Sequence, residues 1–365
     1  MFRFCSSSSW SSAALLTWYQ SCLNSQERCI LESGEIICLK YKVAIKGSRD
    51  TRRCEDEGMW AKNRGDIVNG QSAIQSLLKL LNSQFALNQL GQISLFLGIQ
   101  VLRNTSGYFL TQQHYAKKIL HDAGFDDSKP APTPVTAKSK HKYNNLQPFQ
   151  DPTLYRRLAG SLQYLSILRP DIAFATNLVF QRMHHPTEQD FQALKQLLRY
   201  VKGMSFYGLP IMVGDLNLTT YTNGDWASDT IDCTSISGFC IFLGPNLISW
   251  YVKKQITVAK SSTKVEYRSL SAATSDVIWL HRLVAKLHLE QKSPTVIHCD
   301  NISALAIAKN PVFHARTKHI EIDYQFIRQH IANDDISLTY IPSKDQIADI
   351  LTKPFTTARF NARPS

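Results

Sequence analysis

The sequence predicts an α/β protein in which a five-stranded mixed sheet is flanked by helices. From residue 216 onward, strand-length apolar runs and helical patterns follow one another as strand, strand, strand, helix, strand, helix, helix, strand, helix. Across residues 266–284, apolar residues recur on one helical face, which is typical of a helix that covers a sheet. The sheet must bury its apolar faces under such helices. The expected strands lie near residues 216–223, 236–243, 246–252, 294–299 and 336–341.

The region before this sheet is predicted to contain a strand hairpin followed mainly by helices. A turn-forming segment at residues 103–107 separates two apolar strand-like runs, which indicates a hairpin. Gly124 is expected to end the helix that follows the hairpin. The expected elements are a helix at 72–85, hairpin strands at 93–101 and 108–112, a helix at 113–123 and a helical block at 155–204.

Composition shifts and a proline cluster at residues 130–134 divide the 365-residue chain into five segments. Residues 1–60 match no pattern, and disorder is one interpretation of them. The other segments are a remnant domain at 61–135, a linker with connecting helices at 136–215, the sheet domain at 216–356 and a tail at 357–365.

The charge of the chain indicates a polyanionic partner. The formal net charge is +12, which favours nucleic acid over a small-molecule substrate. No run approaches the ~20 apolar residues that span a bilayer, so we expect no membrane partner. The 8 cysteines form no C-x-x-C pair, which argues against a zinc site. We expect an intracellular protein of the cytoplasm or the nucleus, without a sequence signal that decides between them.

Four short stretches carry the most specific signal in the chain. They are Leu218–Asp225 (LTTYTNGD), Ser261–Tyr267 (SSTKVEY), Val296–Asn301 (VIHCDN) and Asp345–Asp349 (DQIAD). In this order and spacing, they resemble the ribonuclease H domain of the Pol polyproteins of copia-type LTR retrotransposons. The resemblance covers about residues 66–356 and includes further phrases at Phe96–Val101, Tyr155–Tyr164, Arg169–Ala173, Ile248–Trp250 and Asn310–His319.

The resemblance implies a ribonuclease H-like domain that follows the end of a reverse transcriptase. The polymerase turn of this family carries two adjacent aspartates, and Asn63–Gly70 (NRGDIVNG) stands at that place with Asp66 alone. DNA synthesis requires two metal ions held by paired carboxylates. We therefore expect the reverse transcriptase part to be truncated and inactive.

The family pattern of Asp, Glu, Asp and Asp reads here as Asn223, Glu266, Asp300 and Asp349. The resemblance implies that Glu266, Asp300 and Asp349 are catalytic residues that bind two Mg²⁺ ions, as hard anionic oxygens do. Asn223 keeps an oxygen donor but lacks the charge, so the second ion is expected to bind weakly. Asp225 lies two residues further on the same strand face and is the alternative carboxylate.

Each of these positions also has a purely structural interpretation. Glu266 could complete a capping box with Thr263, and Asp300 could cap the helix that begins near Asn301. Asp349 could be a solvent-facing acid in a short helix that starts at Ser343. The pair Asn223-Gly224 is also a common turn sequence.

Basic residues near these motifs are candidate contacts to the phosphate backbone, namely Lys253, Lys254, Lys260, Arg316 and Lys318. The family activity is Mg²⁺-dependent hydrolysis of the RNA strand in RNA–DNA hybrids. Because Asn223 replaces the first aspartate, two alternatives remain open beside that activity. One is a catalytically dead remnant that still binds nucleic acid, and the other is an unstable fragment without function.

Overall fold

The computed structural model describes residues 93–136, 147–229, 232–287, 289–310 and 321–355, with short pieces at 43–45, 79, 83, 87–89, 357 and 360. The chain forms two compact units, Met1–Val101 and Leu102–Ser365. In the first unit, β1 (Val43–Ile45) pairs antiparallel with β2 (Leu87–Gln89). Most of residues 1–60, the Asn63–Gly70 motif and most of the expected helix at 72–85 lie outside the described residues.

The expected strand at 93–101 is interrupted by a turn, so this prediction was wrong in detail. It consists of β3 (Leu95–Phe96) and the start of β4 (Ile99–Asn104), which pair antiparallel. Leu97 and Gly98 have φ angles of 51° and 74°, which reverse the chain between the two strands. Gly98 tolerates this backbone conformation because it has no Cβ. The turn was not predicted, because the residues around it are mostly apolar and resemble one continuous strand.

The five-stranded mixed sheet is confirmed in the second unit. Its strand order is β11-β10-β7-β8-β9. The three long strands form an antiparallel meander, whereas β10 is parallel to both of its neighbours. The strands are β7 (Leu218–Asp225), β8 (Ile236–Leu243), β9 (Asn246–Lys254), β10 (Thr295–Cys299) and β11 (Ile336–Tyr340).

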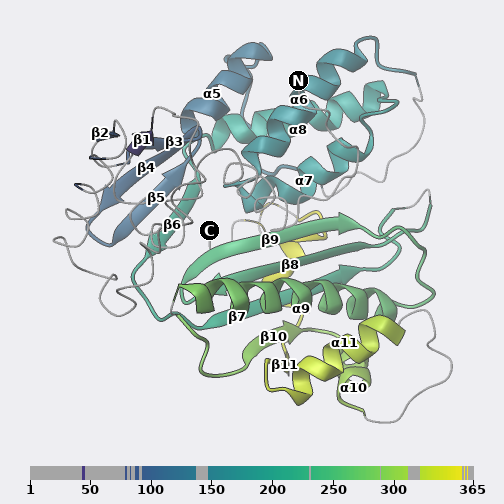
Figure 1. The fold of residues 1–365 in the computed structure, drawn as a ribbon. Coiled ribbons are helices and arrows are strands. Elements are labelled where there is room, and N and C mark those ends of the chain that lie inside the picture. The colour runs from purple at the N-terminus through teal and green to yellow at the C-terminus, as the bar shows by residue number, and fades with distance from the viewer. Residues whose placement is uncertain are drawn as a thin grey trace. The chain divides into compact units, whose positions relative to one another are not determined.

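Three helices accompany this sheet. The long helix α9 (Ser262–Lys286) runs along one face and contacts β7, β8 and β10 (Figure 1). Two shorter helices, α10 (Ile302–Lys309) and α11 (Glu321–Ala332), pack against α9 and β11. Leu270, Ala273 and Val277 of α9 are fully buried in the shared core. The apolar stripe predicted from the sequence is therefore the side of α9 that packs on the sheet.

The opposite face of the sheet contacts a short 3-10 helix, η4 (Ile347–Leu351). The backbone shows how close these layers are. A Cβ on Gly238 of β8 would lie 2.8 Å from side-chain atoms of Leu351 and Thr352. A Cβ on Gly224 of β7 would instead lie 2.7 Å from Val265 of α9. Residues 351–352 and helix α9 therefore pack closely on opposite faces of β7 and β8, near Asn223 and Gly224.

A separate helical cluster precedes the sheet in the same unit. It contains α5 (Gln113–Asp122), α6 (Pro152–Leu165), α7 (Pro170–Gln181) and α8 (Glu188–Gly203), which share one apolar core. The predicted helical block is confirmed, and Gly124 ends α5 with a φ of 69°.

One strand was missed, β6 (Gly208–Met212), which pairs antiparallel with β5 (Gly107–Thr111). None of the helices that the structure describes is long and apolar enough to cross a bilayer.

The helical cluster and the sheet are joined by a packed contact through α7. Ala173 of α7 is buried with Cys240, Ala348 and Leu351 of the sheet domain. The indole of Trp250 donates a hydrogen bond to the carbonyl of Ser166 at 3.2 Å. The described parts of the helical cluster and of the sheet domain therefore share a packed contact. The segment boundaries expected from the sequence stay predictions.

Candidate metal centre

Glu266 lies near the N-terminus of α9 with its carboxylate buried. The helix begins at Ser262, and the Ser261 side chain accepts the backbone N–H of Lys264 as the N-cap. The capping box proposed for Thr263 and Glu266 is therefore wrong, because the capping-box position relative to Ser261 is Lys264 and Glu266 lies two residues further along the helix. Its side chain is only 5% exposed, and it accepts the backbone N–H of Gly224.

The environment of Glu266 strongly disfavours its ionised form. Burial, followed by the nearby charge of Asp300, raises its pKa from 4.5 to about 8. Asp349 acts in the same direction, whereas the Gly224 N–H and the Lys353 ammonium act against it. A buried carboxylate held next to other acids is typical of a functional site, since stability alone gives no reason to place it there.

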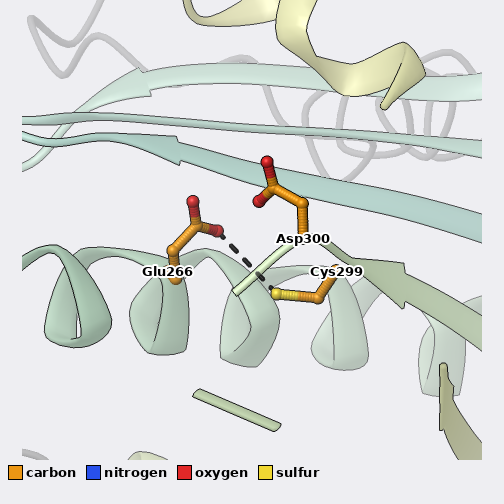
Figure 2. A group of neighbouring side chains, drawn as sticks. All are labelled: Glu266, Cys299 and Asp300. Carbon is orange, nitrogen blue, oxygen red and sulfur yellow. Dashed lines mark hydrogen bonds between the residues drawn. The ribbon is translucent and has the colours of Figure 1, made fainter. Parts of the chain in front are cut away.

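Asp300 directly follows β10 and lies beside Glu266. The helix cap at this point is Asn301, whose side chain accepts the backbone N–H of Ala304, so the capping role proposed for Asp300 is wrong. The Asp300 carboxylate instead accepts the hydroxyl of Ser343 at 2.7 Å. Ligand atoms of Glu266, Cys299 and Asp300 all lie within 4.8 Å of one another (Figure 2).

Cys299 is the unexpected member of this acidic group. Its thiol is fully buried, and its sulfur lies 4.0 Å from Oε2 of Glu266. Burial raises the pKa of the thiol far above its ordinary value, and the Glu266 charge adds to this effect. The thiol therefore remains protonated at neutral pH, and the oxygens of Glu266 and Asp300 are the stronger ligands for a hard cation.

Asp349 lies in η4 and is only 1% exposed, which rules out the solvent-facing interpretation. The helix begins after Gln346 rather than at Ser343. The Asp349 carboxylate forms an ion pair with Lys353 at 3.0 Å. Asp349 stands outside the group of three within 4.8 Å, but its charge raises the pKa of Glu266. It therefore borders the same electrostatic site from the η4 side.

Asn223 points toward η4, because its cross-strand partner Gly238 faces Thr352 and Leu351. Its amide nitrogen donates to the hydroxyl of Thr352. Its amide oxygen is buried and has no hydrogen-bond partner among the described residues. An unpaired buried carbonyl is costly, and a bound cation would satisfy it. This oxygen is a hard donor of the kind that divalent ions prefer. The ligand atoms that lie within 4.8 Å of one another are those of Glu266, Cys299 and Asp300, so the place of Asn223 in the metal site stays a prediction.

Asp225 ends β7 on the same strand face as Asn223. Burial raises its pKa, Lys353 lowers it and Asp349 raises it. The side chain therefore lies within electrostatic reach of Asp349 and Lys353. The role of Asp225 as the alternative carboxylate stays a prediction.

The candidate phosphate contacts differ in their surroundings. Lys260 is exposed and Lys253 is half-buried. Lys254 is bound to Asp229 and Asp232 at 2.6 Å and 2.7 Å, so a phosphate would have to compete with two carboxylates. Arg316 and Lys318 lie outside the described residues.

Two residues at this site escaped the sequence analysis. Lys353 supplies the cation beside Asp349, and the i, i+4 spacing of the two residues was the available signal. Gly224 supplies a backbone N–H and a close strand-to-helix approach. A glycine next to the first motif position gave no indication of either role, because backbone donors have no side-chain signature.

Comparisons with known proteins agree with this architecture. A family profile described as reverse transcriptase (RNA-dependent DNA polymerase) matches residues 66–137. The Pol polyprotein of transposon RE1 from Arabidopsis thaliana is 39% identical over 293 residues, which cover 80% of this chain and 20% of that protein. An uncharacterised mitochondrial protein of the same plant is 44% identical over 216 residues, which cover 58% of this chain and 90% of that protein.

Ribonuclease H1 from Halobacterium salinarum is a structural neighbour with 14% identity and a TM-score of 0.29, and the match covers 37% of this chain and 94% of that one. The fold class is carried by the strand order and helix placement described above. The chain spans about a fifth of the length of the Pol polyproteins that it matches. With the family motifs in order along a ribonuclease H-like sheet, the chain belongs to the Pol polyproteins of copia-type retrotransposons, of which it is a fragment.

Proposed function

We propose that this fragment binds RNA–DNA hybrids and hydrolyses their RNA strand at a Mg²⁺ site, at a rate reduced by Asn223. The observation that carries this proposal is the convergence of Glu266 and Asp300 from different elements to within 4.8 Å, with Asp349 bordering the same site. A bound Mg²⁺ pair would stabilise the attacking and leaving oxygens of the phosphodiester. The 2′-hydroxyls and the shape of the hybrid would distinguish it from DNA.

The residues of the chain have separate tasks in this proposal. Glu266 and Asp300 offer the oxygens that hold the metal, and Ser343 orients Asp300 through its hydrogen bond of 2.7 Å. The Gly224 N–H fixes the carboxylate of Glu266. Lys353 balances the negative charge at Asp349 in the metal-free protein. The reverse transcriptase part is proposed to lack polymerase activity, because Asp66 stands alone in its motif.

A second candidate function is nucleic-acid binding without cleavage. The observation that favours it is Asn223 itself, since an uncharged ligand at the first position weakens the hold on a second cation. The net charge of +12 supplies attraction to a polyanion in either case. The two candidates differ only in whether the surviving carboxylates suffice for hydrolysis.

A cleavage assay on a labelled RNA–DNA hybrid with Mg²⁺ separates the two candidates. We expect slow cleavage by the wild type, none by Glu266→Gln, and an increase of about a hundredfold in Asn223→Asp, the scale of one electrostatic contact at a reacting centre. Asn217→Asp is the matched control, because it adds the same charge at an exposed position before the opposite end of β7. Hybrid binding without cleavage by the wild type and by folded Asn223→Asp would refute the hydrolytic function and leave binding alone.

A further inference from the structure

An exposed apolar rim lies next to the carboxylate site. Trp226 directly follows Asp225 and is 51% exposed. Ile256 and Val258, in the segment between β9 and α9, are 89% and 55% exposed. We call these three residues, together with the exposed Lys260, the Trp226 rim. Large apolar side chains gathered at a surface are informative, because single exposed apolar residues are common but clusters usually mark a binding site.

Hydrogen bonds hold Trp226 and the backbone on either side of the rim. The indole N–H of Trp226 donates to the carbonyl of Ala259 at 2.8 Å. The Ala227 N–H donates to the Ser235 hydroxyl at 3.1 Å. The guanidinium of Arg268 holds the carbonyl of Thr257 at 3.3 Å. Because the indole of Trp226 is already held by its hydrogen bond before any ligand arrives, this aromatic anchor loses little conformational entropy on binding.

The same bonds place the rim beside the site. Ala259, which holds the indole, lies immediately before the N-terminus of α9, and Glu266 lies in the second turn of that helix. Gly224, two residues before Trp226, donates its N–H to the Glu266 carboxylate. A ligand strand that reached the metal ligands would therefore pass close to Trp226.

The charge around the rim favours a polyanionic ligand. The first turn of α9 contains no acidic residue, and Lys260 and Lys264 flank its N-cap. The nearby acids Asp229 and Asp232 both pair with Lys254, and Asp229 also pairs with Arg182. An aromatic face next to lysines and a helix N-terminus is the combination with which proteins hold nucleic-acid strands.

We propose that the Trp226 rim binds the sugar–phosphate backbone of the nucleic-acid strand that crosses the carboxylate site. Trp226, Ile256 and Val258 would pack on the sugars, and Lys260 would pair with a phosphate. This inference rests on the proposed function, since it assigns a contact surface for the same substrate. It adds a positioning role that the carboxylates cannot supply, because they carry the same sign of charge as the strand.

Equilibrium binding of a fluorescein-labelled RNA–DNA hybrid in EDTA tests the rim without cleavage. We expect Trp226→Ala to weaken binding roughly tenfold, on the scale of one aromatic contact to a nucleotide. Trp226→Phe should retain most of the affinity, since packing on a sugar needs the face of the ring and not the indole N–H. Lys260→Gln should lower the slope of log affinity against log salt by about one phosphate contact. Val213→Ser, at a residue 93% exposed before the other end of β7, is the matched control.

Wild-type affinity in folded Trp226→Ala, or an equal loss in Val213→Ser, overturns the proposal. If Trp226→Ala does not fold, Ile256→Ser decides instead, because a side chain 89% exposed contributes little to stability. Loss of self-association in a rim variant without loss of hybrid affinity assigns the rim to a second copy of the chain and also overturns the proposal. Rim-dependent binding without any cleavage would refute only the hydrolytic function, whereas cleavage without a rim effect would refute only this inference.

Discussion

Asn223 differs from an aspartate by one negative charge. The groups around it, Thr352 and Asp349, determine how such a charge would affect stability and metal binding. Thr352 already accepts the amide N–H, and its hydroxyl can turn to donate to a carboxylate instead. Asp349 is buried close by and acts on both Glu266 and Asp225. A fourth acid would therefore add repulsion to the metal-free protein and attraction for a divalent ion.

We predict that Asn223→Asp lowers the melting temperature in EDTA and increases the stabilisation gained from Mg²⁺. Ligand that binds only the folded state raises stability in proportion to the logarithm of its concentration over its dissociation constant. Differential scanning fluorimetry across a Mg²⁺ titration measures both effects. Asn217→Asp should show neither, and a Mg²⁺ response of Asn223→Asp equal to that of the wild type would remove Asn223 from the site.

Glu266 predicts a pH dependence of stability for the metal-free protein. Its folded pKa of about 8 lies above its ordinary value of 4.5, so the folded state holds a proton that the unfolded state releases first. The resulting stability is fully present below pH 4.5 and is lost as the pH rises through 8. We expect urea denaturation in EDTA to show a decline in this window that amounts to a few kcal/mol.

Glu266→Gln is the control for that decline, because the amide has the same shape and does not titrate. Its unfolding free energy should vary less between the two pKa values than that of the wild type. Parallel pH profiles for the two proteins would show that Glu266 is ionised when folded. They would also weaken the case for a buried acidic site.

At the residue scale, the motifs pointed to three acids, whose role as metal ligands stays a prediction, but they did not point to the groups that contact these acids. Glu266 and Asp349 were predicted because four distant phrases matched in order, although each residue alone favoured a structural role. The ion pair of Lys353 and the N–H of Gly224 depend on how η4 and α9 approach β7. Tertiary approach of this kind has no pattern in a single sequence.

Among the elements, the strands of the sheet domain were predictable because long apolar runs bounded by polar turns mark them. β6 was missed, because Gly208 and Pro210 weaken a strand pattern and its partner β5 lies almost a hundred residues earlier. The N-cap of α9 is Ser261, two residues before Thr263, where the capping-box interpretation placed it. Serine and threonine are both favoured N-cap residues, so the run Ser261-Ser262-Thr263 leaves the first turn undetermined.

The contact between β7 and α9 predicts a strong effect of a single methyl group. In Gly224→Ala, the new Cβ would lie 2.7 Å from Val265 and 3.1 Å from the backbone nitrogen of Glu266. The helix must move away from the strand, which would loosen the N–H contact to Glu266. We expect a loss of about 1–3 kcal/mol in unfolding free energy, as for other overpacked cores, together with a further loss of hybrid cleavage.

Gly160→Ala is the matched control, because nothing lies within 4 Å of its Cβ position on the exposed side of α6. Alanine in a helix interior should stabilise the protein by about 0.5–1 kcal/mol. Chemical denaturation of both variants gives the comparison. A Gly224→Ala protein as stable and active as the wild type would mean that β7 and α9 do not touch as closely as described.

For the whole second unit, the helical cluster and the sheet stabilise each other through α7. The sequence suggested a boundary near residue 215, because helical periodicity ends before that point and strand-like runs begin after it. The structure instead buries Ala173 against Cys240 and Leu351. Periodicity identifies the apolar face of each element, but it does not show which distant element covers that face.

This shared interface predicts that the sheet domain is less stable on its own. A fragment of residues 102–365 retains both cores, whereas a fragment of residues 216–365 exposes the side of β8 and η4 that α7 covers. We expect the shorter fragment to melt at a lower temperature. Trp250→Phe should destabilise only the longer one, because the indole N–H binds the carbonyl of Ser166, which the shorter fragment lacks.

Trp279→Phe supplies the control for this comparison, since Trp279 packs against the sheet-domain core that both fragments contain. It should lower the melting temperature of both fragments by a similar amount. Calorimetry measures the melting temperature of both variants in both fragments and of the two unsubstituted fragments. The effect of Trp250→Phe in the longer fragment minus its effect in the shorter one gives the contribution of the interface. An equal effect of Trp250→Phe in the two fragments would show that the hydrogen bond to Ser166 contributes nothing. The cluster and the sheet would then behave as independent folding units.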